Sequence, residues 1–375
     1  MQVLVLGAGQ LAKMMAEEAD TLGLIVRAFD VRTNQVVDPI TKEAHASSLQ
    51  AAIDAANIVT AEFEHIPLDI LTMCENSGKL RPSATAIRTG GDRRIEKGLL
   101  DSAWVKNAAY KVIKDITELQ HAVNTLGLPL VLKSALDGYD GKGQWRLKHQ
   151  QDVERVAVDI SEFIKHSSDS QGIVAEQFVR FEREVSIIGA RNQQGDVACY
   201  PITENQHHEG ILHISVARGD ESAELQAQAQ QIFNNIANAL NYVGVLAVEC
   251  FVTGGQLLVN EIAPRVHNSG HWTQQGAATS QFSNHLRAVC DMPLGSTVQI
   301  APTAMINILG EDELPKTVYQ MPGVTVHWYG KEKRPGRKMG HINVTGQDVA
   351  ELNARLADLA SCLDPHAFPL MAQFA

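Results

Sequence analysis

A glycine-rich run at residues 137–143 is the first candidate for chemistry in this sequence. It follows an apolar segment that ends at Lys133 and reads Asp-Gly-Tyr-Asp-Gly-Lys-Gly. Glycines permit positive φ, so successive N–H groups can turn toward one anion, and Lys133 and Lys142 add positive charge. This suits a polyphosphate under a strand–loop–strand flap, although no GK[ST] of a P-loop is present. A flexible surface hairpin has the same composition, so the run alone leaves both interpretations open.

Two glutamates and an amide form the second candidate. Glu249, Asn260 and Glu261 lie near the ends of two apolar segments joined through Gly254-Gly255, which predicts a hairpin. A loop centred on Gly255 places the glutamates opposite each other, whereas a two-residue turn places Asn260 opposite Glu249. Facing carboxylates destabilise a strand pair unless a cation joins them, and Mg²⁺ shared with phosphate oxygens is the natural candidate. The alternative is a solvated strand end with unrelated acids.

A polar run, residues 264–271 (Pro-Arg-Val-His-Asn-Ser-Gly-His), directly follows these acids. Its two histidines, His267 and His271, lack the third ligand of a zinc site. We expect a substrate-facing loop in which Arg265 anchors an anion. A merely solvated loop fits this segment equally well.

A basic cluster lies near the C-terminus of a chain whose net charge is −11. It consists of Lys331, Lys333, Arg334, Arg337 and Lys338. One or two such groups suffice for a phosphomonoester, which arginine can bind through two hydrogen bonds. A nucleic-acid patch would need more interleaved aromatic residues than Tyr329, and a solvated basic face is the third interpretation.

The turn Gly7-Ala8-Gly9 follows a short apolar segment and precedes a predicted helix. A dinucleotide-binding GxGxxG would need glycine at Ala12, although Asp30 stands where a ribose-binding acid would. We therefore expect this helix N-terminus to serve another anion.

The composition limits the function classes. The chain has 375 residues, 45% hydrophobic and 20% charged, which indicates two or three globular domains. It lacks the basic excess of a duplex-binding protein, an apolar run long enough for a membrane span, and a basic leader typical of a signal peptide. Five widely spaced cysteines predict reduced thiols and hence a cytoplasmic protein. The charge and the short apolar runs predict that it binds neither nucleic acid nor membrane.

The elements that must position these residues change character along the chain. Strands and helices alternate up to about Arg94, which predicts a Rossmann-like parallel α/β domain. The middle predicts two α+β lobes, with strands at 130–133, 144–147, 173–178, 184–189, 243–251 and 257–262 and helices at 152–165 and 221–240. Short strands, the basic cluster and a last helix near 347–360 form the tail.

Taken together, these runs resemble 5-(carboxyamino)imidazole ribonucleotide synthase, an ATP-grasp family of purine biosynthesis. The resemblance rests on residues 139–144, 249–251, 260–261, 264–273 and 334–341 and covers essentially the whole chain. It implies an N-terminal domain at 1–96, an ATP-grasp domain at 97–293 with a lid at about 109–178, and a small β-rich domain at 294–375. It also implies a homodimer.

The activity that the resemblance implies is carboxylation of 5-aminoimidazole ribonucleotide by ATP and bicarbonate. Carboxyphosphate would be the intermediate, ADP and phosphate the by-products, Mg²⁺ or Mn²⁺ the metal, and biotin would not be needed. Closing a lid over carboxyphosphate would protect it from water.

The resemblance further implies roles for individual residues. The ATP contacts are Arg93, Lys133, Gly138, Tyr139, Asp140, Gly141, Lys142, Gly143, Gln144, Glu176, Gln177, Phe178, Val179, Glu184, His207, Asn260 and Glu261. The metal ligands are Glu249 and Glu261. The ribonucleotide contacts are Tyr139, Arg265, His267, Asn268, Lys331 and Arg337, the last two at its phosphate. The catalytic residues are Tyr139, Lys142, Arg265 and Asn268, and Glu62 and Glu64 approach the imidazole.

Two departures from the family pattern and two alternative functions remain. Asp137-Gly138 stands where the family has Gly-Gly, and residues 104–110 replace a proline-containing connection. Another ATP-grasp ligase, or a formate-dependent transformylase acting on a ribonucleotide, would share the lid and acids. A nucleotide-binding regulatory protein would not need the intact set of Lys133, Glu249 and Glu261.

Overall fold

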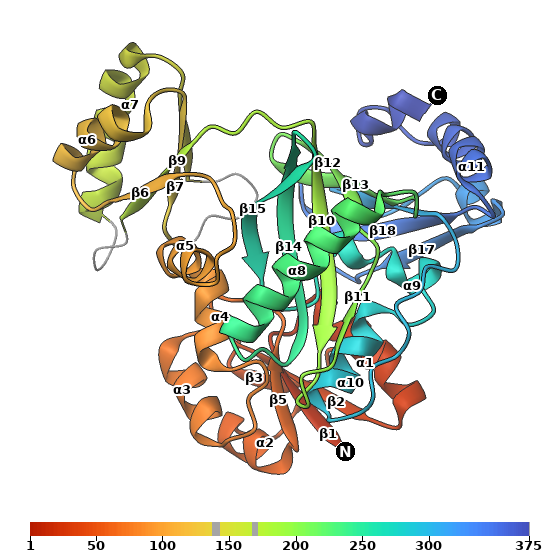
Figure 1. The fold of residues 1–375 in the computed structure, drawn as a ribbon. Helices are drawn as coiled ribbons and strands as arrows, with labels where there is room; N and C mark the ends of the chain where they lie inside the picture. Colours follow the sequence, from red (N-terminus) through yellow and green to blue (C-terminus); the bar gives the residue numbers. More distant parts are fainter. Residues whose placement is uncertain (137–142, 167–171, 375) are drawn as a thin grey trace.

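The computed structural model describes residues 1–136, 143–166 and 172–374. Its strands form three β-sheets, each with helices packed on it (Figure 1). In Figure 1 the N-terminal sheet lies at the bottom, a small lobe lies at the upper left, and the largest sheet runs through the centre toward the C-terminal strands. This arrangement confirms the predicted combination of α/β and α+β parts.

The N-terminal sheet has the strand order β4-β3-β2-β1-β5, in which β1 pairs in parallel with β2 and β5. Its elements are β1 (Gln2–Leu6), α1 (Gln10–Ala19), β2 (Ile25–Asp30), β3 (Gln35–Val37), β4 (Ala44–His45), α2 (Leu49–Ala55), β5 (Ile58–Ala61), α3 (Leu68–Asn76), α4 (Ala84–Gly91) and α5 (Arg93–Ser102). Strand β1 is apolar throughout its buried part, as is typical of a central parallel strand covered on both faces. Because parallel strands end at one edge, the turns after β1 and β5 lie side by side, and the Glu62 N–H donates to the carbonyl of Leu6.

The small lobe has the strand order β6-β9-β7-β8, with antiparallel pairing throughout. Its elements are β6 (Tyr110–Ile113), α6 (Ile116–Leu126), β7 (Leu130–Ser134), β8 (Gln144–Leu147), α7 (Gln150–His166) and β9 (Ile173–Gln177). The Asp115 side chain accepts N–H groups from the first turn of α6 and so fixes where that helix begins. Leu119 of α6 and Leu132 of β7 belong to a separate hydrophobic core, so the lobe packs as its own unit.

The largest sheet has the order β15-β14-β10-β12-β13-β16-β18-β17, with β11 beside β10. Its strands are β10 (Arg183–Arg191), β11 (Val197–Cys199), β12 (Thr203–His208), β13 (Ile211–Ala217), β14 (Gly244–Thr253), β15 (Gln256–Ala263), β16 (Thr303–Leu309), β17 (Val324–Trp328) and β18 (Lys338–Thr345). Because β13 pairs with β16, the C-terminal strands extend the central sheet. The domain limits expected near 96 and 293 stay predictions.

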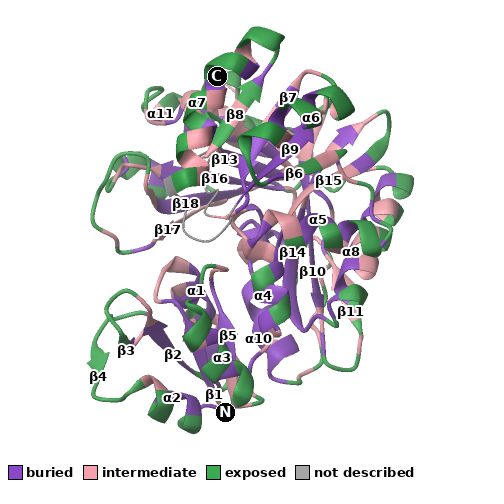
Figure 2. Cartoon of the chain, turned by 90° about the vertical axis from the view of Figure 1, so that its left-hand side faces the viewer, coloured by how far each residue is buried: buried purple, intermediate pink, exposed green. Residues whose placement is uncertain are grey.

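The helices that pack on this sheet include α8 (Ala223–Ala239), α9 (Thr273–Gly276), α10 (Gln281–Val289) and α11 (Val349–Cys362). Of these, α8 and α11 each bury one face, while α10 is buried on nearly all sides. In α8 the buried residues Leu225, Ala229, Phe233 and Ile236 recur at helical spacing and pack with strand residues such as Leu246. Figure 2 shows the buried strands in purple behind helices whose outer faces are exposed.

The cysteines and the helix lengths agree with the composition. The five cysteines all lie in the described residues and are free, with Cys74, Cys250 and Cys290 buried. Burial raises the pKa of the Cys74 and Cys290 thiols to about 11, so both are protonated at neutral pH. Among the described residues, no helix has both the length and the apolar character that crossing a bilayer requires.

His285 joins the N-terminal sheet to the central one. Its Nδ1 accepts the N–H of Val245 on β14 at 3.1 Å, so its Nε2 carries the proton and donates to Thr60 Oγ1 on β5 at 2.9 Å. Burial lowers the pKa of His285 to about 4. The neutral ring therefore fixes two sheets relative to each other.

We expect this histidine to contribute to acid sensitivity. A folded-state pKa below the unfolded value near 6.5 means that the contribution is complete above about pH 6.5 and is lost as the pH falls toward about 4, about 3 kcal/mol in all. His285→Gln keeps a donor and an acceptor without titrating. Urea unfolding at about pH 7.5 and about pH 5 should show a smaller pH-dependent loss in this variant. An equal loss in both proteins would contradict the assignment.

Candidate functional site

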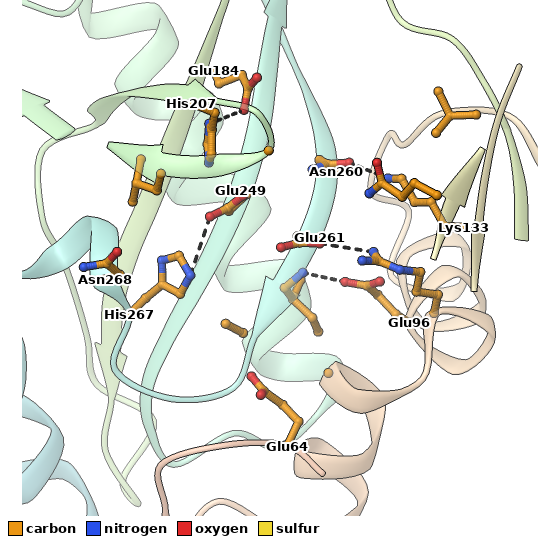
Figure 3. Close-up of a pocket in the computed structure, with 18 of the residues that line it drawn as sticks. Glu64, Glu96, Lys133, Glu184, His207, Glu249, Asn260, Glu261, His267 and Asn268 are labelled. Atoms are coloured by element: carbon orange, nitrogen blue, oxygen red, sulfur yellow. Dashed lines mark hydrogen bonds and ion pairs between the residues drawn. The ribbon is translucent and has the colours of Figure 1, made fainter. Parts of the chain in front are cut away.

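A cavity of about 920 Å³ lies where the three parts of the chain meet, which is at the upper end of volumes typical of ligand sites. Each part contributes to its wall. The N-terminal part supplies Gln10, Glu62, Glu64 and Arg93, the small lobe Lys133, Gln144 and Glu176, and the largest sheet His207, Glu249, Glu261 and Lys338. Figure 3 shows many of these side chains converging from the facing elements.

The hairpin β14–β15 carries the two glutamates directly opposite each other. Thr253 pairs with Gln256, so the turn between them has two residues, Gly254 and Gly255. Both glycines have positive φ, as two-residue hairpin turns of this kind require. That turn alone would place Asn260 opposite Glu249. A register shift between Glu249 and Cys250 leaves Asn260 as the extra residue of a β-bulge, so Glu249 pairs with Glu261. The bulge thus decides the register that the sequence left open.

The two glutamates differ in their electrostatic surroundings. Burial raises the pKa of Glu249 to about 7, and the facing charge of Glu261 adds to this shift. For Glu261, burial acts in the same direction, but Arg93 and Lys133 outweigh it and lower the pKa. Arg93 donates from Nη1 to Glu261 Oε2 at 3.1 Å, whereas Glu249 has His267 Nε2 at 3.5 Å (Figure 3). The free-energy cost of burying an ionised carboxylate is therefore less compensated at Glu249 than at Glu261.

This glutamate pair fits a hard divalent cation. Two carboxylates on adjacent strands provide oxygen ligands and like charges that a cation would neutralise. In the part of the chain that the structure describes, no three His, Cys, Asp or Glu side chains form a group that could hold a metal ion. The remaining ligands would therefore come from water or phosphate oxygens, as is usual for Mg²⁺.

Lys133 lies between two oxygen acceptors at the lobe side of the cavity. Its Nζ is 2.8 Å from Glu176 Oε2 and donates to Asn260 Oδ1 at 3.0 Å. The other oxygen of Glu176 is 3.1 Å from Nζ of Lys97. Burial would raise the pKa of Glu176, but Lys133 and Lys97 lower it to about 2. The Glu176 carboxylate is thus held by two lysines, while Gln177, Phe178 and Val179 after it line the cavity.

His207 and Glu184 form a pair on the wall made by β10 and β12. The His207 Nδ1 is 2.8 Å from Glu184 Oε2, beside a β-bulge at Gln206 and His207 (Figure 3). Burial alone would lower the pKa of His207, but Glu184 outweighs it, so the pKa is raised. The rings of Phe181 and Phe251 stack nearby with centroids 4.5 Å apart and give this wall an apolar surface.

The loop after β15 brings Arg265, His267 and Asn268 to the other end of the cavity. Arg265 Nε is 2.7 Å from Glu64 Oε1, so a residue from each of two domains forms this ion pair. Burial keeps the pKa of His267 well below its ordinary value, and its Nδ1 lies 2.8 Å from Ser269 Oγ. Asn268 exchanges two side-chain hydrogen bonds with Asn307 of β16, which fixes its orientation.

The structure brings most predicted site residues together. The cavity lining includes Arg93, Lys133, Gln144, Glu176, Gln177, Phe178, Val179, Glu184, His207, Glu249, Asn260, Glu261, Arg265, His267 and Asn268. Gly143 lies beside β7, where its carbonyl accepts the Ser134 N–H. The predicted contacts Gly138, Tyr139, Asp140, Gly141 and Lys142 lie outside the described residues.

Lys331 and Arg337 do not line the cavity in this conformation, whereas Lys338 of the same cluster does. Lys331 donates to the Lys338 carbonyl at 3.2 Å, with its Nζ 5.4 Å from the ring centroid of Tyr329. Arg337 donates to the Glu332 carbonyl at 2.9 Å. Their predicted role at a phosphate stays a prediction.

Sequence reasoning named Glu62 for the imidazole side but missed its contact with the turn before α1, and it missed Glu96 and Lys97 altogether. The anion at the Gly7–Gly9 turn is the protein's own Glu62, whose carboxylate accepts the N–H groups of Gly9 and Ala12 at the start of α1. Glu96 lines the cavity, and burial raises its pKa to about 8. Lys97, the next residue, is fully buried but does not belong to the lining. Only their position shortly after Arg93 could have pointed to them.

Three family models match the chain in sequence order. They are the ribonucleotide synthetase preATP-grasp domain at residues 1–90, the ATP-grasp domain at 98–282, and the phosphoribosylaminoimidazole carboxylase C-terminal domain at 303–355. Glu64, Lys133 and Lys338, which all line the cavity, thus come from three regions with different family matches.

Similar proteins agree over essentially the full length. The N5-carboxyaminoimidazole ribonucleotide synthase of Vibrio parahaemolyticus is 55% identical over 100% of this chain and 99% of its own. The solved structure of the corresponding synthetase from Thermus thermophilus is 35% identical with a TM-score of 0.83, covering 96% of this chain and 98% of that one. The Aspergillus clavatus synthase, solved with ADP and 5-aminoimidazole ribonucleotide, is 29% identical with a TM-score of 0.83, covering 96% and 98%.

The raised pKa of Glu249 predicts that Glu249→Gln stabilises the metal-free protein. At pH 8 the buried charge is removed, and we expect a gain of about 1–3 kcal/mol. The same variant should lose most of the stabilisation that Mg²⁺ with a nucleotide gives the unaltered protein. Chemical unfolding in EDTA and in Mg²⁺ with ADP measures both effects. A destabilised variant that keeps the full Mg²⁺ effect would refute the metal assignment.

Proposed function

The chain belongs to the family of N5-carboxyaminoimidazole ribonucleotide synthases, and from that membership we propose how its cavity carries out the reaction. The protein is an ATP-grasp ligase that carboxylates 5-aminoimidazole ribonucleotide to N5-carboxyaminoimidazole ribonucleotide in purine biosynthesis. Bicarbonate attacks the γ-phosphate of ATP, which gives carboxyphosphate and ADP. The amine then takes the carboxyl group and phosphate leaves, without biotin.

The observation that carries this assignment is the arrangement of charge along one cavity. At one end, Arg93 and Lys133 stand next to the glutamate pair on the β14–β15 hairpin, which suits a triphosphate with its cation. At the other end, Arg265 and the neutral His267 follow directly from the same hairpin. A nucleotide and a second substrate therefore meet at the glutamates.

On the nucleotide side, each group has a defined task. Lys133 and Arg93 bind phosphate oxygens, and the residues after Glu176 hold the adenine against the apolar wall of Phe251. Glu184 and His207 bind the ribose hydroxyls and nearby phosphate oxygens. Gly138 to Gln144 form the lid, with Lys142 as a further cation over the phosphates. Positioning and charge neutralisation are the main contributions that phosphoryl transfer needs from a protein.

Glu249 and Glu261 are the proposed ligands of a divalent cation, Mg²⁺ or Mn²⁺. When bound, this cation neutralises charge on the phosphate oxygens during transfer. Asn260 stays beside it and orients Lys133 through its amide oxygen.

On the ribonucleotide side, Arg265, His267 and Asn268 position the imidazole and the carboxyl group, together with Tyr139. Glu64 fixes the Arg265 guanidinium and approaches the imidazole from the N-terminal domain. Lys331 and Arg337 bind the phosphate, which requires the 331–338 segment to turn toward the cavity on binding. Lys338 already lines the cavity and adds positive charge there.

We further propose that the protein acts in the cytoplasm as a homodimer. Free and partly buried cysteines suit a reducing compartment. Analytical ultracentrifugation of the purified protein tests the subunit number.

ADP release tests the function directly. We expect it to need ATP and bicarbonate and to be increased by 5-aminoimidazole ribonucleotide, because ADP forms in the first step and the amine then removes carboxyphosphate. Each component is omitted in turn, and formate replaces bicarbonate in a parallel assay. ADP release that follows formate would indicate a transformylase instead, and binding of ATP without release would indicate a regulatory protein.

Arg337→Ala should raise the KM for the ribonucleotide about tenfold and leave the KM for ATP unchanged, since it removes one charged contact to a phosphate. Arg334→Ala is the matched control, because Arg334 lies in the same cluster but pairs with Glu332 in solvent. Steady-state kinetics of both variants provides the measurement. Equal increases in both KM values, or equal effects of both variants, would show that the cluster serves another purpose.

A further inference from the structure

Lys97 is a buried cation that the proposed reaction does not use. It lies on α5, its side chain is 1% exposed, and its Nζ is 3.1 Å from Glu176 Oε1. The Tyr110 ring lies on its other side, with the centroid 5.9 Å from Nζ. Lys97 does not line the cavity, so it has no direct path to a substrate.

The carboxylate of Glu176 is shared between two lysines of different exposure. Its Oε1 faces Lys97 and its Oε2 lies 2.8 Å from Lys133, which does line the cavity. Lys133 therefore has two positions open to it: against Glu176 and Asn260, or forward on a nucleotide phosphate. Lys97, which does not line the cavity, can lie against Glu176 but not on a nucleotide phosphate.

Moving Lys133 onto a phosphate takes positive charge away from Glu176. The side chain of Glu176 is only 6% exposed, so water cannot replace the lost partner. A buried carboxylate that loses its partner is strongly destabilised, and it responds by taking up a proton. With Lys97 in place, one ammonium group remains at Oε1 and the carboxylate stays ionised.

We propose that Lys97 is a positioning residue for ATP binding: it remains paired with Glu176 when Lys133 leaves that carboxylate for a nucleotide phosphate. This inference rests on the proposed role of Lys133 at ATP. It gives Glu176 a task beyond its position at the adenine, because its carboxylate holds Lys133 in place until the nucleotide arrives.

The other charged groups around Glu176 do not replace Lys97. Arg93 of α5 contributes to the low pKa of Glu176 but donates to Glu261. Glu261 of β15 is itself negative, and Tyr110 of β6, opposite Glu176 in the sheet, has its pKa raised to about 12 by burial and so stays neutral. Lys97 and Lys133 are the two cations in contact with this carboxylate among the described residues.

Proton uptake on nucleotide binding tests the proposal. Titration calorimetry with a nonhydrolysable ATP analogue and Mg²⁺, in buffers of different ionisation enthalpy, counts the protons. We expect Lys97→Met to take up about one proton more than the unaltered protein and to bind about ten- to a hundredfold more weakly, with Kd rising about tenfold for each pH unit. The KM for the ribonucleotide should not change.

Matched variants separate this role from a structural one. Lys106→Met removes an exposed lysine from the connection after α5 and should leave both proton uptake and affinity unchanged. The double variant Lys97→Met with Glu176→Gln removes both charges, so the extra proton uptake should disappear. If Lys97→Met does not fold, Lys97→Gln, which can still donate to Glu176, should show the same extra proton.

Two results distinguish the possible failures. Binding by folded Lys97→Met or Lys97→Gln without extra proton uptake would overturn this inference while leaving the ATP site intact. Unchanged affinity of Lys133→Met for the analogue would instead contradict the proposed function of the site.

Discussion

The structure depends on balancing buried charge around one cavity. Glu176 and Glu249 are carboxylates with little access to water, and Glu261, whose side chain is 37% exposed, faces Glu249 across the hairpin. A cation within contact distance stabilises such a carboxylate. Glu261 has Arg93 and Glu176 has two lysines, whereas Glu249 has the neutral His267 at 3.5 Å and a raised pKa. Glu249 is therefore the carboxylate whose charge a metal ion would neutralise. Negative charge is thus incompletely neutralised at the place where a nucleotide and its cation would bind.

Each of the three parts of the chain contributes charged groups to that balance. Arg93 and Lys97 come from α5 at the end of the N-terminal part, Lys133 and Glu176 from the small lobe, and the glutamate pair from the largest sheet. His285 and the Arg265–Glu64 pair tie the N-terminal part to the central sheet. The small lobe has its own hydrophobic core, so its cations can approach the hairpin as one unit.

Glu62 is bound by the glycine turn that precedes α1. The turn Gly7-Ala8-Gly9 before α1 has the backbone of an anion site, yet its N–H groups bind a carboxylate from the neighbouring turn. A side chain at Gly7 would collide with Glu62, since an added Cβ would lie 2.4 Å from its Cγ. The glycine at position 7 thus permits close packing of two turns at one sheet edge.

Local patterns in the sequence were sufficient to predict several secondary-structure elements and many of the charged residues of the site. Apolar periodicity predicted β1, β2 and β8 with the bounds that the structure has, and the family motifs predicted about half of the residues that line the cavity. Strand bounds and motifs can both be predicted because they depend on residues that are close together in the sequence. Tertiary structure alone decided the register of Glu249 and Glu261, since a bulge at Asn260 is set by packing across the sheet. It also decided the partners of Lys97 and Glu62, because contacts between distant segments depend on how separately folded parts pack together.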